Sequence, residues 1–404
     1  MAIAKGIAKQ VKYKQEVTFG TAPVAAASQA LRRVTSDINL TKQTYQSNEI
    51  RADYQVADMR HGVREVAGTI NGELSPGTHK DFLAASLRKA WAATAAITAA
   101  SVTIAGTLGV YTITRAAGDY LVDGLKIGDV IRLSVGTLHA NNINKNLIIT
   151  ALTGTVATVA AVNGSALAAE GPITGTTITI IGKKTWVPAT GHTSLSYSIE
   201  HWYGDVAQSE LFTGCKVNQV DVQLPATGMA TCNVGFMGQN LTTDSAEYFT
   251  SPTAQSSTGV LAAVNGGLYV DGTAIATVTG MNFTINSNIT GEAVVGSNQK
   301  PELFDGRVTV SGQFTAFFEN ASLRDLFLNE TEASIVGVFT TDSSATADFM
   351  SFVFPRIKAG GASKDDGEKG IIQTIPFTAL LNTDGGTALS SHATTISIQD
   401  STVA

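Results

Sequence analysis

The sequence contains one long internal repeat, and this feature restricts the possible folds more than any other. A constant offset of 244 residues, with no gap, superimposes Gly68 on Gly312 and Val66 on Val310. Each copy is an alternating segment that contains glycine, then a break, then a short helix-like opening. Self-similarity over such a length indicates two related structural units in one chain.

The alternating segment of each copy predicts a β-strand with one face in a core. Side chains two positions apart lie on the same face of a strand. In the first copy this face carries Val66, Gly68, Ile70, Gly72 and Leu74, and in the second copy it carries Val308, Val310, Gly312, Phe314 and Ala316.

A short helix is predicted after each of these strands. Thr78 and Ser322 are predicted N-caps, and Asp81 and Asp325, three residues later, complete a variant of the capping box. Apolar residues then follow at helical spacing, which predicts that each helix packs on its own sheet. They are Phe82, Leu83, Leu87 and Trp91 in the first copy, and Leu323, Leu326 and Phe327 in the second.

The composition favours a mainly β protein. The 404 residues are rich in Thr, Ala, Val, Gly and Ile, and only 15% are charged. The net charge of −6 argues against stable binding to nucleic acid or to anionic lipid. The sequence shows no signal-peptide pattern and no apolar run of membrane-spanning length, so we expect a soluble protein made in the cytoplasm.

A second, shorter offset indicates an insertion in the first copy. "MATCNVGFMGQN" from Met229 resembles "GIIQTIPFTALLN" from Gly370, with Phe236 on Phe377. The difference between the two offsets leaves about 100 additional residues, from Ala92 to Pro188, whose Val/Ile/Thr runs and turns predict a small β-barrel or sandwich. The predicted organisation is an arm (1–29), a discontinuous first domain (30–91 and 189–245), the insert (92–188), a linker (246–260) and a second domain (261–404).

The segment "LRRVTSDINLTKQTYQSNEIRADYQVADMRHGVREVAGTINGELSPGTHKDFLAASLRKAW" closely resembles tail tube proteins, also called major tail proteins, of long non-contractile-tailed bacteriophages. "YKQEVTFGTAP" before it looks like the arm of that family. The resemblance implies β-sandwich tube domains, each flanked by a helix. Six such domains form a ring whose sheets join into a continuous inner barrel, and rings stack into a tube that conducts genomic DNA.

The resemblance also implies partners and a place. With two tube domains in each chain, three chains complete a ring, whereas single-domain family members form hexameric rings. Further implied partners are tape-measure, tail terminator and initiator proteins, and DNA that passes without specific contact. The expected location is the virion tail, after assembly in the host bacterial cytoplasm. Acidic and neutral side chains are expected in the lumen, and the insert is expected outside the tube as a spacer or stabiliser rather than a sugar-binding decoration.

Two segments are candidate assembly sites under this interpretation. The first is the arm, which either binds a neighbouring ring or is a frayed terminus; its residues are Lys12, Tyr13, Lys14, Glu16 and Phe19. The second is the loop expected between the first two strands, from Lys42 to Gly62, which is either an inter-ring contact or a solvated loop. Its candidate residues are Tyr45, Glu49, Arg51, Asp53, Tyr54 and Arg60.

An enzyme is not expected. The six histidines are scattered, and they match no metal-ligand or catalytic spacing. His201 follows Glu200 directly, but adjacent residues on a strand point to opposite faces. We therefore predict no catalytic, metal-binding or cofactor-binding residue. The alternatives to a tail tube are a β-rich surface adhesin or fibre, and the tube of a phage-derived injection device.

Overall fold

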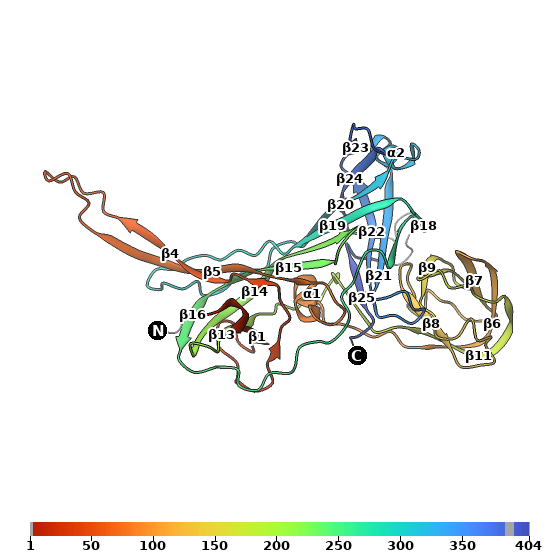
Figure 1. Cartoon of the computed structure of the whole chain (residues 1–404), viewed down its shortest axis with the longest axis horizontal. Coiled ribbons are helices and arrows are strands. Elements are labelled where there is room, and N and C mark those ends of the chain that lie inside the picture. The colour runs from red at the N-terminus through yellow and green to blue at the C-terminus, as the bar shows by residue number, and fades with distance from the viewer. Residues whose placement is uncertain (1–2, 384–391, 404) are drawn as a thin grey trace.

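A computed structural model describes residues 3–383 and 392–403, and the protein is mainly β as predicted. One 19-stranded sheet system runs through the molecule, and six further strands form a separate closed barrel. Figure 1 shows the sheet system curving from a projecting hairpin at one end to an upright group of strands, with the barrel at the other end.

The first part of the sheet system comes from both sides of the barrel in sequence. It begins with a 3₁₀ turn at Gly6–Ala8. Its strands are β1 (Lys9–Gln15), β2 (Gln29–Ala30), β3 (Thr35–Ser36), β4 (Asn39–Gln46), β5 (Met59–Glu73), β13 (Tyr197–Tyr203), β14 (Gln208–Pro225), β15 (Thr231–Gly238) and β16 (Asn240–Asp244), and its helix is α1 (Lys80–Leu87).

The second part follows without interruption. Its strands are β17 (Gly266–Val270), β18 (Thr273–Ala274), β19 (Val278–Asn286), β20 (Thr309–Phe317), β21 (Glu332–Thr340), β22 (Phe349–Ala359), β23 (Ser363–Lys364), β24 (Ile372–Ala379) and β25 (Ser397–Asp400), and its helix is α2 (Ser322–Leu328). Residues 384–391 of the predicted second domain lie outside the described residues.

The barrel has its own apolar core. Its strands are β6 (Ile97–Thr107), β7 (Val110–Arg115), β8 (Val130–Ser134), β9 (Leu147–Leu152), β10 (Val156–Ala161) and β11 (Glu170–Ile180). Residues such as Ile104, Ile113 and Val159 are fully buried inside it. After β11, strand β12 (Lys183–Trp186) leads the chain back and pairs with β25.

The two parts of the sheet system repeat one pattern of strand pairing. Gly68 in β5 lies opposite Phe236 in β15, and Gly312 in β20 lies opposite Phe377 in β24. These are the residues that the two sequence offsets align. The hairpins β13–β14 and β21–β22 also share a bulge at the same place. We call β1, β4, β5, α1, β13, β14 and β15 the first repeat, and β17, β19, β20, α2, β21, β22 and β24 the second repeat.

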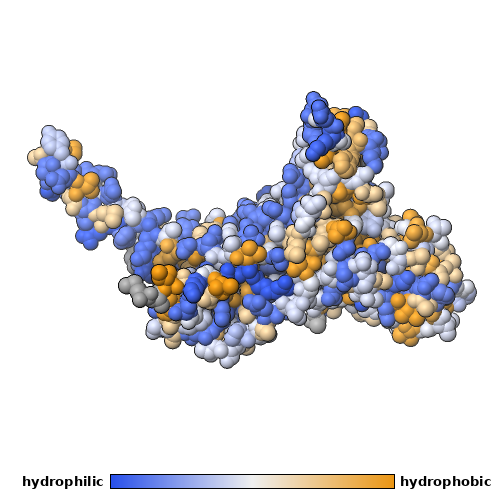
Figure 2. All heavy atoms as spheres, viewed as in Figure 1, coloured by the Kyte–Doolittle hydropathy of each residue, from blue (hydrophilic) through white to orange (hydrophobic). Residues whose placement is uncertain are grey.

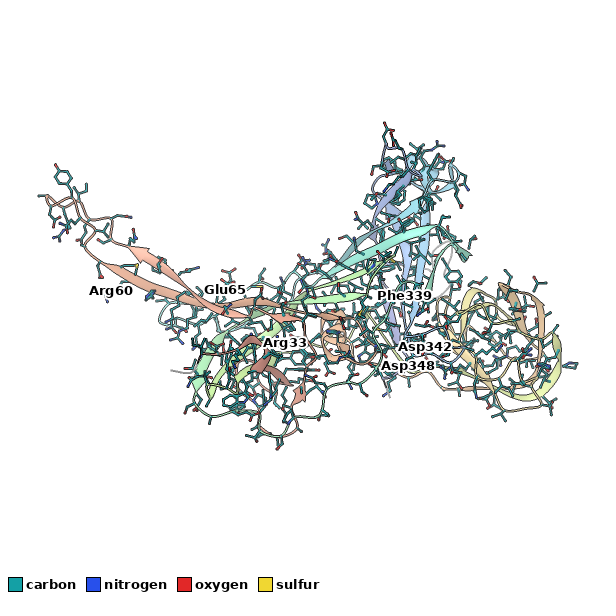
Figure 3. All side chains as sticks on the ribbon, viewed as in Figure 1. Arg33, Arg60, Glu65, Phe339, Asp342 and Asp348 are labelled. Atoms are coloured by element: carbon teal, nitrogen blue, oxygen red, sulfur yellow. The ribbon has the colours of Figure 1, made fainter. Side chains whose placement is uncertain are left out.

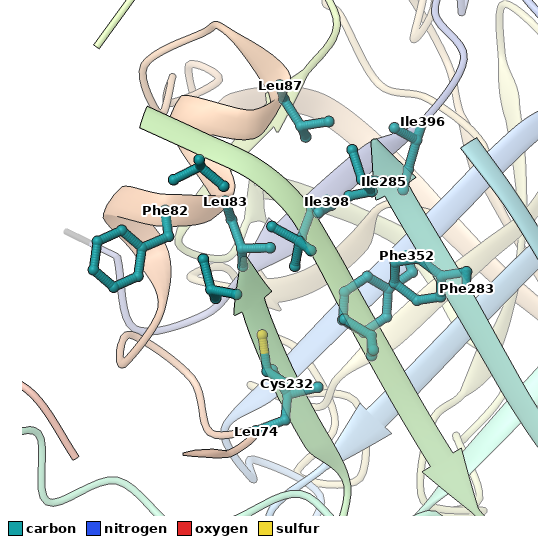
Figure 4. Close-up of a cluster of buried hydrophobic side chains, with 14 of the residues drawn as sticks. Leu74, Phe82, Leu83, Leu87, Cys232, Phe283, Ile285, Phe352, Ile396 and Ile398 are labelled. Atoms are coloured by element: carbon teal, nitrogen blue, oxygen red, sulfur yellow. The ribbon is translucent and has the colours of Figure 1, made fainter. Parts of the chain in front are cut away.

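The core of the first repeat lies between its sheets and α1. Val66, Ile70 and Leu74 in β5 are fully buried, as alternation predicts. Helix α1 buries Phe82, Leu83 and Leu87 against the same cluster, and Figure 4 shows these side chains over β15 and β14. The Phe82 ring contacts three other rings, those of Tyr13, Tyr197 and Phe236, with centroids 4.6–5.4 Å away.

The predicted helix caps are wrong in both repeats. Helix α1 begins after His79, and the Thr78 hydroxyl instead bonds the Ser75 hydroxyl. Helix α2 begins at Ser322 itself, so that residue is inside the helix rather than its cap. In each case the hydroxyl bonds a nearby turn residue instead of capping the helix. The Ser322 hydroxyl donates to the Asn320 side chain, and the Thr78 hydroxyl pairs with the Ser75 hydroxyl.

The apolar residues of the helices are also placed partly otherwise than predicted. Trp91 lies beyond the end of α1, and its indole Nε1 donates to the Lys80 carbonyl at 2.9 Å. In α2, Leu323 and Leu326 pack against the core, but Phe327 is 40% exposed. Helix α2 therefore covers its sheet less completely than α1 does.

Candidate assembly surfaces

The two repeats are joined by one pair of strands. The second half of β14 pairs with β19, from Gln219 opposite Asn286 to Pro225 opposite Gly280. The sheet therefore runs without a break in the order β4, β5, β15, β14, β19, β20, β24 and β23. The β14–β19 junction joins the four strands of the first repeat in this row to the four strands that follow.

The outer strands of this row each have an unused edge among the described residues. Strand β4 pairs with β5 on one side, and β23 pairs with β24 on one side. Strand β4 pairs with β5 as β19 pairs with β20, so β4 is the equivalent of β19. Strands β22 and β23 follow one another along β24 as β14 follows β15, so β23 is the equivalent of the second half of β14. The two ends of the row are thus equivalent to the two strands that meet at the internal junction. Unpaired N–H and C=O groups at such edges are templates for pairing with another chain.

One face of the row is apolar and the other is polar. Along the middle of the polar face, directly opposed residues follow one another across six strands. They are Asn71, Asn233, Asp221, Thr284, Ser311 and Thr378, and we call them the polar row. The Thr284 hydroxyl donates to Asp221 at 2.6 Å, so the row is locally ordered by side-chain hydrogen bonds.

The neighbouring rows on this face have the same character. One contains Glu73, Thr231, Gln223, Asn282, Gln313 and Pro376, and the other contains Thr69, Gly235, Gln219, Asn286 and Thr309. Taken together, the three rows hold two carboxylates, Glu73 and Asp221, and no lysine or arginine. These three rows therefore offer hydrogen-bonding groups without positive charge, and Lys358 in β22 lies opposite Thr378 at the end of the polar row.

The hairpin of β4 and β5 projects away from the body of the molecule (Figure 1). The predicted loop from Lys42 to Gly62 is wrong in its extent, since strand structure continues to Gln46 and resumes at Met59. We call residues 43–62 the hairpin arm. Apolar side chains are highly exposed on it, among them Ile50, Tyr54 and Val56, and orange atoms mark part of this surface in Figure 2.

All six candidate residues of the predicted inter-ring loop lie on the hairpin arm. Arg51 and Asp53 form an ion pair at 2.7 Å, and Arg60 pairs with Asp58 at 2.8 Å. Tyr45 and Tyr54 are exposed, and Glu49 is exposed as well. Figure 3 places Arg60 on the arm and Glu65 at its base. Exposed ion pairs of this kind contribute little stability, so they can exchange for other partners.

The residues of the predicted N-terminal arm do not form a free segment in the single chain. Lys12 and Tyr13 are buried in β1, which pairs with β13 and β2. The Lys12 ammonium donates to the Phe249 carbonyl at 3.1 Å and pairs with Glu247. The alternative of a frayed terminus is also wrong for these residues, because β1 is an inner strand of its sheet.

The other arm residues are likewise used within the chain. The buried Glu16 carboxylate accepts hydrogen bonds from the backbone of Gly20 and Gly214 and from two serine hydroxyls. Lys14 donates to the Val24 carbonyl, and Phe19 lies beneath the Lys216 ammonium, 5.4 Å from ring centre to nitrogen. Their physical role in the single chain is to fix the turn after β1.

Asp81 and Asp325, the predicted capping acids, have other partners. The Asp81 carboxylate accepts the Tyr13 hydroxyl at 2.8 Å, and burial together with Asp81 raises the pKa of Tyr13 well above its ordinary value. Asp325 pairs with the adjacent Arg324 at 2.8 Å. No local sequence pattern indicates the contact between Tyr13 and Asp81, because the two residues are far apart in the chain.

His201 and Glu200 do not form a catalytic couple. The Glu200 carboxylate accepts the backbone N–H groups of Tyr248 and Phe249. His201 contacts Ser36 and Glu210 instead, and burial lowers its pKa. Among the described residues, no group of three or more His, Cys, Asp or Glu is placed to hold a metal ion. No helix in the described part of the chain is long and apolar enough to cross a membrane.

Taken together, these are the features of a β protein with open sheet edges. The chain matches the model of the phage tail tube protein family over residues 6–379, and it belongs to that family. It is therefore a structural component of the virion tail. A search of curated proteins gave no match.

Proposed function

We propose that three copies of this chain close into a ring, that rings stack into the hollow tail tube, and that genomic DNA passes through the bore. The β14–β19 junction carries this proposal. It joins two equivalent repeats within one chain, and the same two strand positions are left open at the ends of the row. Repetition of the junction between chains closes the row on itself.

The internal junction predicts the register between chains. Thr284 lies opposite Asp221 in β19 and β14. Asn39 takes the place of Thr284, because Asn39 lies opposite Ala67 and Thr284 lies opposite Ser311, which the offset of 244 relates to Ala67. Ser363 takes the place of Asp221, because these two residues lie opposite Thr374 and Asn233, which the second offset relates to each other. Asn39 of one chain is therefore expected opposite Ser363 of its neighbour.

The polar face is the proposed wall of the bore. Helix α1 and the apolar core cover the other face of the row, which supports an outward position for that face in the ring. Uncharged polar groups and scattered carboxylates do not hold phosphate, because strong binding to DNA requires lysine or arginine contacts. This composition suits a duct through which DNA slides.

Several finer points of the proposal rest on the family rather than on the row of strands. They are contacts with tape-measure, terminator and initiator proteins, assembly in the host cytoplasm, and the lack of enzymatic activity. We also propose the domain division given above, with the barrel outside the tube and the N-terminal residues up to Gln15 reassigned to the first tube domain, since β1 belongs to its sheet.

A cysteine pair tests the ring. In the double variant Asn39→Cys, Ser363→Cys, mild oxidation of assembled protein is expected to give covalent species that end at the trimer, because opposed strand residues lie within disulfide distance. The native cysteines, Cys215 and Cys232, are buried, and the wild-type chain and each single variant serve as controls. A ladder that continues to six chains would replace the trimer by a hexamer. Assembled tubes without any cross-link would contradict the proposed junction.

A further inference from the structure

The hairpin arm has a counterpart in the second repeat that is already docked. The connection between β19 and β20, residues 287–308, corresponds to residues 43–64 by the same offset. It does not project freely. In Figure 1 it runs from β19 and β20 back along β15 and β5, so it lies across the first repeat and points in the same direction as the arm.

Lys216 in β14 holds this docked connection in place. Its ammonium lies 3.0 Å from Glu302 and 3.7 Å from Asp305, and it also donates to the Leu303 carbonyl. The Lys216 side chain is 7% exposed, so the contact is desolvated. Further along, Gln239 donates to the Lys300 carbonyl at 2.7 Å. A buried charge with carboxylate and carbonyl partners is a strong anchor.

Each part of this anchor has an equivalent elsewhere in the chain. Lys358 in β22 corresponds to Lys216, because Lys216 lies opposite Met237 and Lys358 lies opposite Thr378, the residue that corresponds to Met237. On the arm, the offset of 244 relates Glu302 to Asp58 and Leu303 to Met59. The carboxylate of Glu302 and the large apolar residue are retained, whereas the place of Asp305 is taken by His61.

Lys358 and Asp58 do not make the contacts that Lys216 and Glu302 make. Lys358 is half-buried, and the carboxylate of Glu332 opposite it already receives two hydrogen bonds from Arg356, at 2.6 and 2.8 Å. Asp58 is exposed and pairs only locally, with Arg60. Val56 stands at the position of Lys300 and is 65% exposed, and Leu381, next to the residue equivalent to Gln239, is 52% exposed. The contact that corresponds to Gln239 and Lys300 is therefore apolar.

We propose that the base of the hairpin arm docks on the second repeat of the neighbouring chain in the same ring, where the Lys358 ammonium binds the Asp58 carboxylate and the Met59 carbonyl. The partner is thus a second copy of this chain. This inference rests on the proposed ring, since the arm follows β4 onto the neighbour that offers β23. It differs from the sequence-based expectation of a contact between rings, and leaves only the tip of the arm beyond the ring.

Charge reversal tests the contact. Lys358→Glu or Asp58→Lys is expected to raise the concentration needed for assembly by about tenfold, because each places like charges together. The double variant restores the pair with its signs exchanged and is expected to assemble within about twofold of wild type. Glu49→Lys, on the same arm, is the matched control and is expected to form rings normally. Failure of the double variant to recover, with both single variants folded, would overturn the contact.

A second cysteine pair separates this inference from the ring itself. Asp58→Cys with Lys358→Cys is expected to give cross-linked species that end at the trimer, as the Asn39 and Ser363 pair does. If only the Asn39 and Ser363 pair reacts, the arm contact is wrong and the ring stands. A ladder that passes beyond the trimer for Asp58 and Lys358 would place the arm between rings and also overturn the inference. If neither pair reacts in assembled protein, the ring proposal fails.

Discussion

Gly68 and Gly312 show what a repeated residue means physically. A Cβ atom on Gly68 would lie 2.4 Å from the Ile38 Cα atom, and one on Gly312 would lie 2.5 Å from the Asn282 carbonyl. In both repeats the preceding strand crosses too closely for any side chain. The sequence predicted the equivalence of these glycines, but the crossing backbone that requires them is visible only in three dimensions.

His79 is a buried titratable residue of the first repeat. It is 1% exposed, and within the described residues neither ring nitrogen has a hydrogen-bond partner. Burial, and secondarily the charge of Arg32, lowers the pKa of His79 to about 4. The imidazole is therefore neutral in the folded protein over most of the range in which an exposed histidine becomes charged.

This His79 pKa predicts acid destabilisation of the chain. Between the ordinary pKa of 6.5 and the folded pKa of about 4, the unfolded state binds more protons, so stability falls as the pH falls through this window. Urea unfolding is expected to show a loss of about 2 kcal/mol between pH 7 and pH 5 from this residue. His79→Gln should lack that part of the loss. Equal pH dependence in the two proteins would contradict the assignment.

Lys12 and Glu16 mark a limit of sequence-based prediction at this scale. Charged residues near a terminus suggest an exposed segment, and this inference was wrong. The compensating partners, Phe249, Glu247 and Gly214, lie about 200 residues or more further along the chain. Burial of a charge depends on such partners, and no local pattern reports them.

Among the elements, the strands of the repeat were the most predictable and the hairpin arm the least. Alternation in β5 identifies its buried face because Val66 and Ile70 face a core. The arm has no buried face in the single chain, so its strands carry polar and apolar residues without a simple period. Its extent followed only from pairing between β4 and β5. The junction of β14 with β19 was not predicted for the same reason, since it is a non-local pairing.

The barrel is fixed to the second repeat, although it interrupts the first in sequence. The Gln399 side chain in β25 bonds both the N–H and the carbonyl of Val130, and also the Ile181 carbonyl, at 2.8–2.9 Å. Beside it, Lys184 and Asp129 form a buried ion pair at 2.9 Å. Val130 also packs with Val336, Phe349 and other apolar residues of the second repeat. Strand β25 therefore clamps the barrel to the body.

Removal of this clamp is expected to loosen the barrel. Gln399→Ala leaves the buried backbone groups of Val130 without these partners, which is expected to lower the free energy of unfolding by about 1–3 kcal/mol. Limited proteolysis should then cut faster in the connections at residues 92–96 and 187–196. Gln55→Ala on the exposed arm is the control and should change neither result. An unchanged cutting rate for Gln399→Ala would contradict the proposed role of Gln399 in holding the barrel.

At the scale of the whole molecule, the essential feature is the β14–β19 junction within one chain. It is an example of the pairing that is open at the two ends of the row, at β4 and β23. The repeat predicted from the sequence supplies two equivalent units, and the β14–β19 junction supplies the geometry by which such units join. In the ring that we propose, three chains provide six units around a bore lined by the polar row. Each chain of that ring also contributes one barrel, so the proposed exterior has threefold symmetry while the inner wall is close to sixfold.

Electron microscopy of end-on views with rotational averaging tests this symmetry most directly. The account predicts a hollow ring or tube with three outer lobes, one for each barrel, around a nearly sixfold bore. Six outer lobes would contradict the three-chain ring while leaving a tube. Compact single chains under every assembly condition would contradict the tube itself.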